Sequence, residues 1–473
     1  MRWRLASCDN ALSAGGLGEG GAGPARAILI DCGSVVVAGS GSAPDSPDPL
    51  PASPAARRAA TPPSAAPPRV PRELPLLLTL AAVQFTHVVD FMIMMPLGPQ
   101  FMRLFAIGPQ QFGFMVSAYT FAAAVSGFVA AFWIDRFDRR RALLGLYAGF
   151  IGATALCGIA PDYPLLLMAR IVAGMFGGIL GGLVFAIVAD LVPYARRATA
   201  TAVVAAAFSL SAVAGVPLSL SIAAQFSWRA PFLALAALSV VVGLAAMRLI
   251  PPLAAHAAPG TRRRPINQLR AIFGVGNHRR AFAFMTVLMC SVFAIVPFLA
   301  AYNVANVGVA EADLAMIYFA GGAASLVTAQ VIGRLADRYG KQRLFTILAL
   351  ISIGPILVIT HLPPLPLSWV VPLSVLFFVF VPGRFGPAAA LVSGSVEPRL
   401  RGSFMSFNAS IQQLASGIAS LTAGLIIGRA PDGTLTHFGA VGWLSVGCTL
   451  CCLWLVRRIR VVDVGAAAAP LVP

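Results

Sequence analysis

The chain has 473 residues, of which 58% are hydrophobic and only 11% are charged, and its formal net charge is +17. Soluble globular proteins carry about 25% charged residues, so this composition excludes an ordinary soluble enzyme and indicates a polytopic membrane protein. The basic residues lie between apolar segments, as they do in the cytoplasmic loops of membrane proteins, and therefore do not indicate nucleic-acid binding.

The first 73 residues differ in composition from the rest of the chain. They are rich in Ala, Pro, Gly and Ser and contain the pairs Pro62-Pro63 and Pro67-Pro68. A segment of this kind cannot bury a hydrophobic core. Its basic start, Arg2 and Arg4, is also not followed by the apolar stretch of a secretory signal peptide. We therefore expect residues 1–73 to be a low-complexity, disordered cytoplasmic tail, or an extension read from a misplaced start codon.

From residue 74 onward the chain is a series of apolar runs. Each run is close to the roughly 20 residues that a helix needs to cross a bilayer. We expect an all-α polytopic membrane protein with about twelve transmembrane helices, at 74–96, 111–133, 142–160, 164–189, 199–224, 230–250, 281–303, 312–334, 343–361, 366–392, 403–428 and 437–456.

Basic residues gather in every second loop of this series. The basic loops lie within 134–141, 190–197, 248–280, 333–343, 397–401 and 457–460, whereas the other loops hold Arg103, Arg229 and Arg429. Because cytoplasmic loops carry such an excess, both termini are predicted to be cytoplasmic. The longest loop, a linker at 251–280, separates a six-helix bundle at 74–250 from a second at 281–457. A cytoplasmic tail is expected at 458–473.

Two loops in equivalent positions of these halves match each other. After the second span the chain reads Ile134-Asp135-Arg136-Phe137-Asp138-Arg139-Arg140-Arg141, and after the eighth it reads Gly333-Arg334-Leu335-Ala336-Asp337-Arg338-Tyr339-Gly340-Lys341. An acid followed by arginines recurs after the fourth and tenth spans, at Asp190 and Glu397. Repeated halves of six helices are typical of transporters whose substrate site lies between the halves.

With these motifs, the segment from about 74 to 460 resembles the major facilitator superfamily, and within it the twelve-helix bacterial drug:proton antiporter and sugar-efflux branch. Residues Gly333 to Lys341 are similar to the superfamily's G-x-L-A-D-R-x-G-R/K signature. The first copy departs from it, with Ala131 and Asp138 where glycine is usual. The resemblance implies a cytoplasmic gate at Asp135, Arg136, Arg139, Arg140, Gly333, Asp337, Arg338, Gly340, Lys341, Asp190 and Glu397. For the arginines, simple anchoring at the membrane surface is the alternative.

Few charges lie inside the predicted spans. A charge there costs at least about 2.5–3.5 kcal/mol, so each is a functional candidate. His87 and Asp90 share one face of the first span, and Arg170 lies at a similar depth in the fourth. We therefore predict an Asp90–Arg170 pair. The resemblance implies that Asp90 takes part in proton coupling. A purely structural ion pair, and a hydrogen-bonded core histidine at His87, are the alternatives.

Two further features lie within the spans. Gly215 and Pro217 resemble part of the antiporter motif of the fifth helix, for which an ordinary proline kink is the alternative. Arg384 lies in the inner half of the tenth span. It is expected to pair with Asp337 or Glu397 at the cytoplasmic gate, or to attract an anionic group.

The function predicted from these residues is proton-coupled efflux of a small organic solute by alternating access. The alternatives are uptake or facilitated diffusion of a solute such as a sugar, and a non-transporting sensor. No phosphate-binding loop, hydrolase motif or metal-ligand spacing occurs in the sequence, so no enzyme activity, cofactor or metal is expected. We expect a monomer in the bacterial cytoplasmic membrane, with the lipid bilayer and a small-molecule substrate as its partners and the proton gradient as its energy source.

Overall fold

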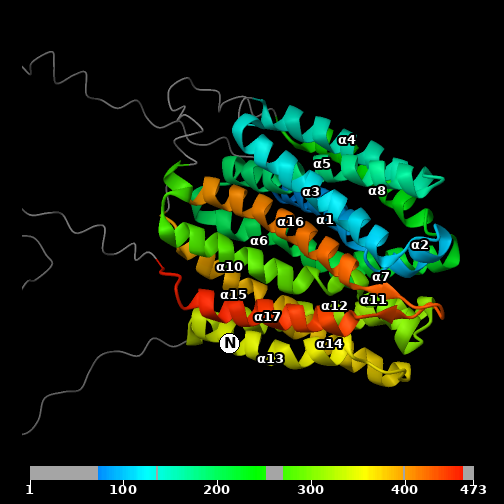
Figure 1. The fold of residues 1–473 in the computed structure, drawn as a ribbon. Helices are drawn as coiled ribbons and strands as arrows, with labels where there is room; N and C mark the ends of the chain where they lie inside the picture. The colour runs from blue at the N-terminus through cyan, green and yellow to red at the C-terminus, as the bar shows by residue number, and fades with distance from the viewer. Residues whose placement is uncertain (1–72, 135–136, 252–269, 398–399, 462–473) are drawn as a thin grey trace, which may run out of the picture. The chain divides into compact units, whose positions relative to one another are not determined.

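Long helices make up nearly all of the chain that the computed structural model describes, which is residues 73–134, 137–251, 270–397 and 400–461. The predicted tails and the linker fall largely outside this range. The helices belong to one unit, 67–473, and lie side by side (Figure 1).

The first half of the described chain contains the helices of the predicted first bundle. They are α1 (Glu73–Ile93), α2 (Gly98–Leu104), α3 (Pro109–Trp133), α4 (Arg139–Ile159), α5 (Tyr163–Leu191), α6 (Tyr194–Leu210), the π-helical η3 (Ser211–Gly215), α7 (Val216–Gln225) and α8 (Ala230–Leu249).

The second half repeats this series with more interruptions. Its elements are α10 (Gly276–Phe293), α11 (Val296–Tyr302), η5 (Asn303–Val307), η6 (Glu311–Asp313), α12 (Leu314–Tyr339), α13 (Lys341–Thr360), α14 (Leu367–Gly383), α15 (Phe385–Gly394), α16 (Arg401–Ile426), β1 (Gly428–Arg429), β2 (Leu435–Thr436) and α17 (Phe438–Val456). The antiparallel pair β1–β2 is a small addition to the all-helical fold that the sequence predicts.

Eleven segments in the described residues are long and apolar enough to cross a membrane. They correspond to eleven of the twelve predicted spans. The remaining prediction, 403–428, corresponds to α16, which is equally long but is not among these eleven because it carries several serines, an asparagine and two glutamines. The fold is that of a multi-pass helical membrane protein, in which α16 is shielded by packing on neighbouring helices.

Helix α16 packs along α3, and this contact joins the two halves (Figure 1). A Cβ added at Gly113 would lie only 2.8 Å from the backbone oxygen of Ser420. At the other end of the contact, the rings of Phe132 and Phe407 lie 5.9 Å apart. The α3–α16 contact therefore runs along most of both helices, and glycine permits its closest approach.

The second contact between the halves is shorter. Across the halves, helix α12 packs on η3 and α7 and much less on α6. A Cβ added at Gly322 would lie 2.7 Å from the backbone oxygen of Ala212. Thus α12 meets only part of the broken fifth span, in contrast to the long α3–α16 contact.

The two ends of the helix bundle differ in how the halves pack. We call the end that carries Arg139 and Lys341 the basic end, and the end that carries α2 and η6 the far end. At the far end, one hydrophobic core contains residues of both halves, such as Phe112 and Phe298. Toward the basic end there are two separate cores, one around Phe150 and one around Phe284. The halves therefore share a hydrophobic core at the far end, whereas toward the basic end each half has a core of its own and the two halves meet through Phe132 and Phe407.

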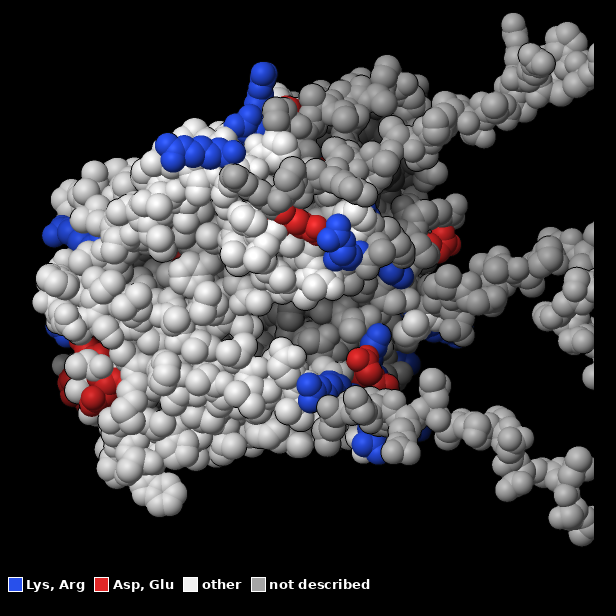
Figure 2. Space-filling view, turned by 180° about the vertical axis from the view of Figure 1, so that it is seen from behind, with Lys and Arg blue, Asp and Glu red and all other residues white. Residues whose placement is uncertain are grey.

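The surface fits a lipid environment. Large apolar side chains are exposed along most of the long helices, among them Trp369 and Trp443. Figure 2 shows one face on which most described side chains are uncharged and charged residues occur in small separate groups. Such a surface is stable against hydrocarbon and not against water.

Candidate functional site

The predicted ion pair between the first and fourth spans is present. Arg170 Nη1 on α5 donates to Asp90 Oδ2 on α1 at 2.9 Å, and Thr154 Oγ1 on α4 donates to Asp90 Oδ1 at 3.2 Å. Both charged side chains are buried, at 0% exposure for Asp90 and 1% for Arg170. The pair needs this arrangement, because a lone charge at this depth would be strongly unfavourable.

Tyr119 of α3 completes this charged centre. The Arg170 guanidinium lies 4.4 Å above the centre of the Tyr119 ring, a cation–π contact. Phe91 of α1 packs against the same tyrosine ring, 5.4 Å away. Sequence reasoning missed Tyr119 and Thr154, because both meet Asp90 or Arg170 only through helix packing.

Glycines of α5 allow α3, which carries Tyr119, to approach α5 closely. A Cβ added at Gly174 would lie 2.3 Å from the Tyr119 backbone oxygen, and one added at Gly178 would lie 2.4 Å from that of Ala123. Helices α3 and α5 therefore approach with their backbones nearly in contact, as small residues allow inside membranes. This close packing fixes Tyr119 above Arg170.

His87 lies one turn before Asp90 on α1, beside the pair but not bonded to it. Its ring makes an edge contact with Phe150, with 6.3 Å between ring centres. His87 Nδ1 and Gln84 Oε1 are buried atoms without a hydrogen-bond partner among the described residues. The same is true of Tyr119 Oη and Arg170 Nε.

The motif of the fifth span places α1 against η3. A Cβ added at Gly215 would lie 2.3 Å from Val89 Cγ2, so only glycine fits without a shift. Ser211 Oγ donates to the backbone oxygens of Phe85, at 3.3 Å, and of Ala207, at 2.8 Å. Pro217 lies in the first turn of α7, where its missing N–H costs little.

Arg384 lies where α14 ends and α15 begins, and it meets neither Asp337 nor Glu397. Its guanidinium donates to three hydroxyls, those of Ser291 at 2.6 Å, Thr449 at 2.8 Å and Ser352 at 3.2 Å, and to the Val381 backbone oxygen at 3.1 Å. The side chain is completely buried.

The hydroxyls around Arg384 are themselves satisfied. Ser352 donates to a backbone oxygen of its own helix, as does Thr449, and Ser445 donates to the Ser291 backbone oxygen at 2.6 Å. The Ser291 hydroxyl lies 3.1 Å from Ser445 Oγ and 3.0 Å from Thr449 Oγ1, so its hydrogen also has an acceptor. The lone pairs of the three hydroxyls are left to accept from the arginine. The expected gate contact is not formed, and the cluster instead ties α10, α13, α14 and α17 together.

The first gate loop is only partly visible, because Asp135 and Arg136 lie outside the described residues. Arg139 Nε pairs with Asp190 Oδ2 at 2.6 Å, and Arg140 Nη2 donates to the Met247 backbone oxygen at 2.5 Å. Asp138, which replaces the usual glycine, caps α4 by accepting from the Arg141 N–H at 3.1 Å. Its φ of −58° is ordinary, so this turn needs no glycine.

The second gate loop, unlike the first, turns at a glycine with a positive φ. Gly340 has a φ of +90°, a conformation that favours glycine. Gly333 does not have a positive φ. Asp337, Arg338 and Lys341 are exposed, and the Arg338 guanidinium lies 5.4 Å from the Tyr339 ring centre.

The acid after the tenth span contributes a backbone turn. Glu397 is followed by 398–399, which lie outside the described residues, and its backbone oxygen accepts from the Leu400 N–H at 3.0 Å.

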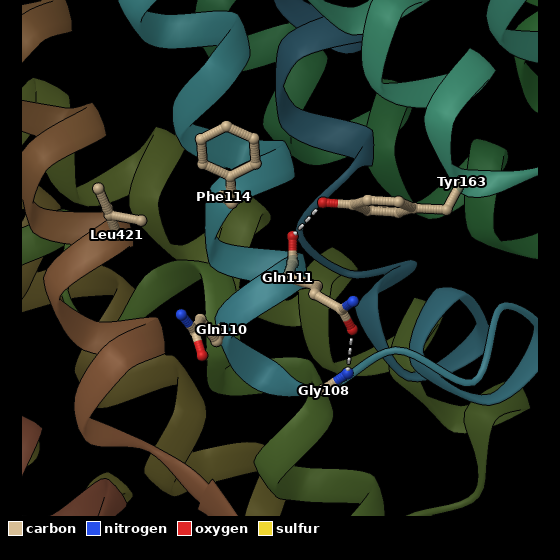
Figure 3. A pocket seen from close by; sticks show the side chains of 6 residues that line it. All are labelled: Gly108, Gln110, Gln111, Phe114, Tyr163 and Leu421. Carbon is tan, nitrogen blue, oxygen red and sulfur yellow. Dashed lines mark hydrogen bonds between the residues drawn. The ribbon is translucent and has the colours of Figure 1, made fainter.

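A separate pocket of about 450 Å³ lies toward the far end, between the start of α3, the start of α5 and α16. Figure 3 shows Tyr163 donating to the Gln111 backbone oxygen and the Gly108 N–H donating to the Gln111 side chain, at 3.0 Å each. The rest of its lining is Gln110, Phe114 and Leu421. This pocket contains none of the predicted site residues and no charged side chain.

Known proteins are similar to this chain in both sequence and fold. The family model of the Major Facilitator Superfamily matches residues 80–464. An uncharacterized MFS-type transporter of Bacillus subtilis strain 168, YceJ, is 24% identical over 360 residues, which are 76% of this chain and 90% of the relative.

A second relative and a solved structure agree. YbcL, another uncharacterized MFS-type transporter of that strain, is 23% identical over 336 residues, covering 70% of this chain and 83% of YbcL. The crystal structure of a D-xylose-proton symporter superposes with a TM-score of 0.66 at 17% identity, over 82% of this chain and 99% of the symporter. The match of the family model over most of the described helices is decisive, and this chain belongs to the Major Facilitator Superfamily.

Proposed function

We propose that this chain is a proton-coupled exporter of a small organic solute in the bacterial cytoplasmic membrane. The observation that carries the proposal is the buried pair of Asp90 and Arg170. Among the described residues Asp90 is the one carboxylate buried in a span. It is held by an arginine and a threonine hydroxyl.

A carboxylate in this position suits a proton carrier. While Asp90 is ionised, Arg170 neutralises it, and the pair is electrically neutral in the membrane. When Asp90 takes up a proton, the ion pair is lost, and Arg170 must find other partners. Its unpartnered Nε and its place above the Tyr119 ring give the guanidinium alternative contacts within reach. Protonation is thereby coupled to a change in packing between α1, α3 and α5.

The packing of the halves supports alternating access. The core shared by both halves at the far end, with separate cores toward the basic end, supports a state that is closed at the far end. With the predicted cytoplasmic placement of the basic loops, this is an inward-facing state. A solute would enter from the cytoplasm in this state and leave when the packing at the two ends reverses.

The test is proton-driven flux in proteoliposomes with Asp90→Asn. We expect the variant to reach the membrane and fold normally while losing solute movement driven by a pH gradient. Asp162→Asn is the matched control, since Asp162 caps α5 at the protein surface and asparagine caps equally well.

The substrate for this assay comes from a growth-inhibition panel in a host without its own efflux pumps. Resistance to one compound class that disappears in Asp90→Asn identifies the solute and the direction together. Undiminished proton-driven flux in Asp90→Asn would refute Asp90 as the carrier. Accumulation of a solute in cells, instead of resistance, would support uptake over export.

A further inference from the structure

Exposed arginines gather at the basic end of the second half, where α10 begins and α17 ends. We call them the arginine patch, and they are Arg279, Arg280, Arg457, Arg458 and Arg460. The apolar segment that contains α10 starts at Gly276, and the one formed by α17 stops at Val456. The arginine patch therefore lies at the edge of both spans, at the depth of the headgroups of a bilayer.

Helices α10 and α17 lie side by side and run antiparallel (Figure 1). Ser445 Oγ of α17 donates to the Ser291 backbone oxygen of α10 at 2.6 Å. Two turns nearer the basic end, the Cys452 thiol donates to the Phe284 backbone oxygen at 3.9 Å. Continued to the basic end, this register brings the start of α10 beside the end of α17.

Asn277 fixes the two helix ends to each other. Its Nδ2 donates to the Arg460 backbone oxygen at 2.8 Å, and its Oδ1 accepts from the Arg460 N–H at 3.0 Å. The same Nδ2 also donates to the Ser395 backbone oxygen, just after α15, at 3.1 Å. The arginines two and three residues after Asn277 are thus held beside those that end α17.

The positive charge of the arginine patch is not balanced by the described part of the chain, since none of its five side chains forms an ion pair with a carboxylate there. Arginines at the same end of the first half differ, because Arg139 pairs with Asp190 at 2.6 Å and Arg196 with Glu73 at 2.7 Å. The two patch arginines of α10 also lie in its opening turns, where the helix dipole opposes a positive charge.

An exposed apolar stripe of α17 leads to the arginine patch. Trp443, Leu450 and Trp454 are 60%, 52% and 53% exposed, and their helical spacing places them on one face. Arg458 continues this face, and its guanidinium lies 3.7 Å from the Trp454 ring centre. Tryptophan is enriched where hydrocarbon meets headgroups. An acyl chain lying along this stripe would place its headgroup at the arginine patch.

We propose that the arginine patch binds an anionic phospholipid with two phosphates, of the cardiolipin class. Guanidinium groups bind phosphate oxygens through paired hydrogen bonds, and basic sites between membrane helices hold such headgroups. Two phosphates complement a patch of five arginines better than the one phosphate of phosphatidylglycerol or the zwitterion of phosphatidylethanolamine. The inference is independent of the proposed function, because it uses neither Asp90 nor Arg170.

Native mass spectrometry of the purified full-length protein tests this proposal. The probes are tetraoleoyl cardiolipin, dioleoylphosphatidylglycerol and dioleoylphosphatidylethanolamine, and we expect cardiolipin to bind at least tenfold more tightly than either of the others. Arg458→Gln should weaken cardiolipin binding about three- to tenfold, and Arg279→Gln/Arg280→Gln should weaken it at least as much.

Arg248→Gln provides the comparison, because Arg248 is an exposed arginine in the last turn of α8, the sixth span and the counterpart of α17 in the repeat. It should leave cardiolipin binding unchanged. Equal weakening by Arg248→Gln and Arg458→Gln would overturn the proposal, because it would assign the binding to the general positive charge of this end. Wild-type binding in Arg458→Gln would also overturn it. Unfolding midpoints measured without added lipid should match the wild type, since all of these side chains are exposed.

Two further comparisons separate the lipid from its parts. Pyrophosphate carries two phosphates but no acyl chains, and it should not displace cardiolipin at equal concentration. Displacement would refute the role of the apolar stripe. Phosphatidylglycerol that binds as tightly as cardiolipin would refute the requirement for two phosphates.

Discussion

Arg103 of α2 and Glu311 of η6 form a two-pronged ion pair across the two halves at the far end. Arg103 Nη2 donates to Glu311 Oε2 at 3.1 Å, and Nη1 contacts the other carboxylate oxygen. The two residues follow the first and seventh spans, which are equivalent in the repeat. The pair therefore closes the far end at the same place in both halves, and it must break whenever that end opens.

Reversing one charge of this pair should favour opening of the far end. Arg103 is largely exposed, so the pair contributes only about 0.2–1 kcal/mol, and Arg103→Glu should shift the populations by about fivefold at most. Spin labels at the exposed positions Leu104 and Ala310 would report the distance distribution. The double variant Arg103→Glu/Glu311→Arg should restore the wild-type distribution. If the double variant behaved like the single one, the pair would have no role in closure.

Adding a methyl group at Gly178 should force α3 and α5 apart. The new Cβ would lie 2.4 Å from a backbone oxygen, which cannot move aside as a flexible side chain would. We expect Gly178→Ala to cost about 1–3 kcal/mol and to lower the midpoint of thermal unfolding in detergent. Gly182→Ala, on the same helix but with open space at its Cβ, is the control. Equal midpoints for the two variants would contradict the close packing.

Removing the Arg384 guanidinium should reduce stability without abolishing coupling. Arg384→Met leaves three buried hydroxyls without their donor, and hydrogen bonds to a charged group contribute about 1.5–3 kcal/mol each. Thermal unfolding should shift to lower temperature, while proton-driven flux per folded molecule stays near that of the wild type. Loss of coupling at unchanged stability would instead assign Arg384 to the transport cycle.

The two glycines of the second gate loop should differ in their tolerance of alanine. Gly340 has a φ of +90°, and a side chain there costs about 1–3 kcal/mol of backbone strain. Gly333 is in an ordinary helical position with open space around it. Gly340→Ala should therefore lower the unfolding midpoint, and Gly333→Ala should not. Comparison by thermal unfolding of both purified variants would decide this.

The spans were predictable because hydrocarbon forces every backbone group into a helix, and only a long apolar run can provide one. Helix α16 was predicted as a span although it is more polar than the others, and its polar residues are tolerated because α3 and α10 cover them. The short β1–β2 pair carries no sequence pattern strong enough to reveal it.

The Asp90–Arg170 contact was predictable because depth in the membrane follows from position along each helix. Neighbours across helix faces were not, since Tyr119, Thr154 and Gln84 are defined by rotation of one helix against another. Arg384 was misjudged for the same reason, because its hydroxyl partners come from three helices that are distant in sequence. Arg103 was visible only as a basic residue in a loop that otherwise has none.

The long contact between α3 and α16 bears on how the halves can move. Because these helices already touch from Gly113 near one end to Phe132 near the other, they cannot approach further, and separating them would break a contact along most of their length. We therefore expect the α3–α16 contact to act as the hinge about which the two halves rotate. The shorter contact of α12 with η3 and α7 is then expected to change more, and a pair of labels on α3 and α16 should change its separation least during the cycle.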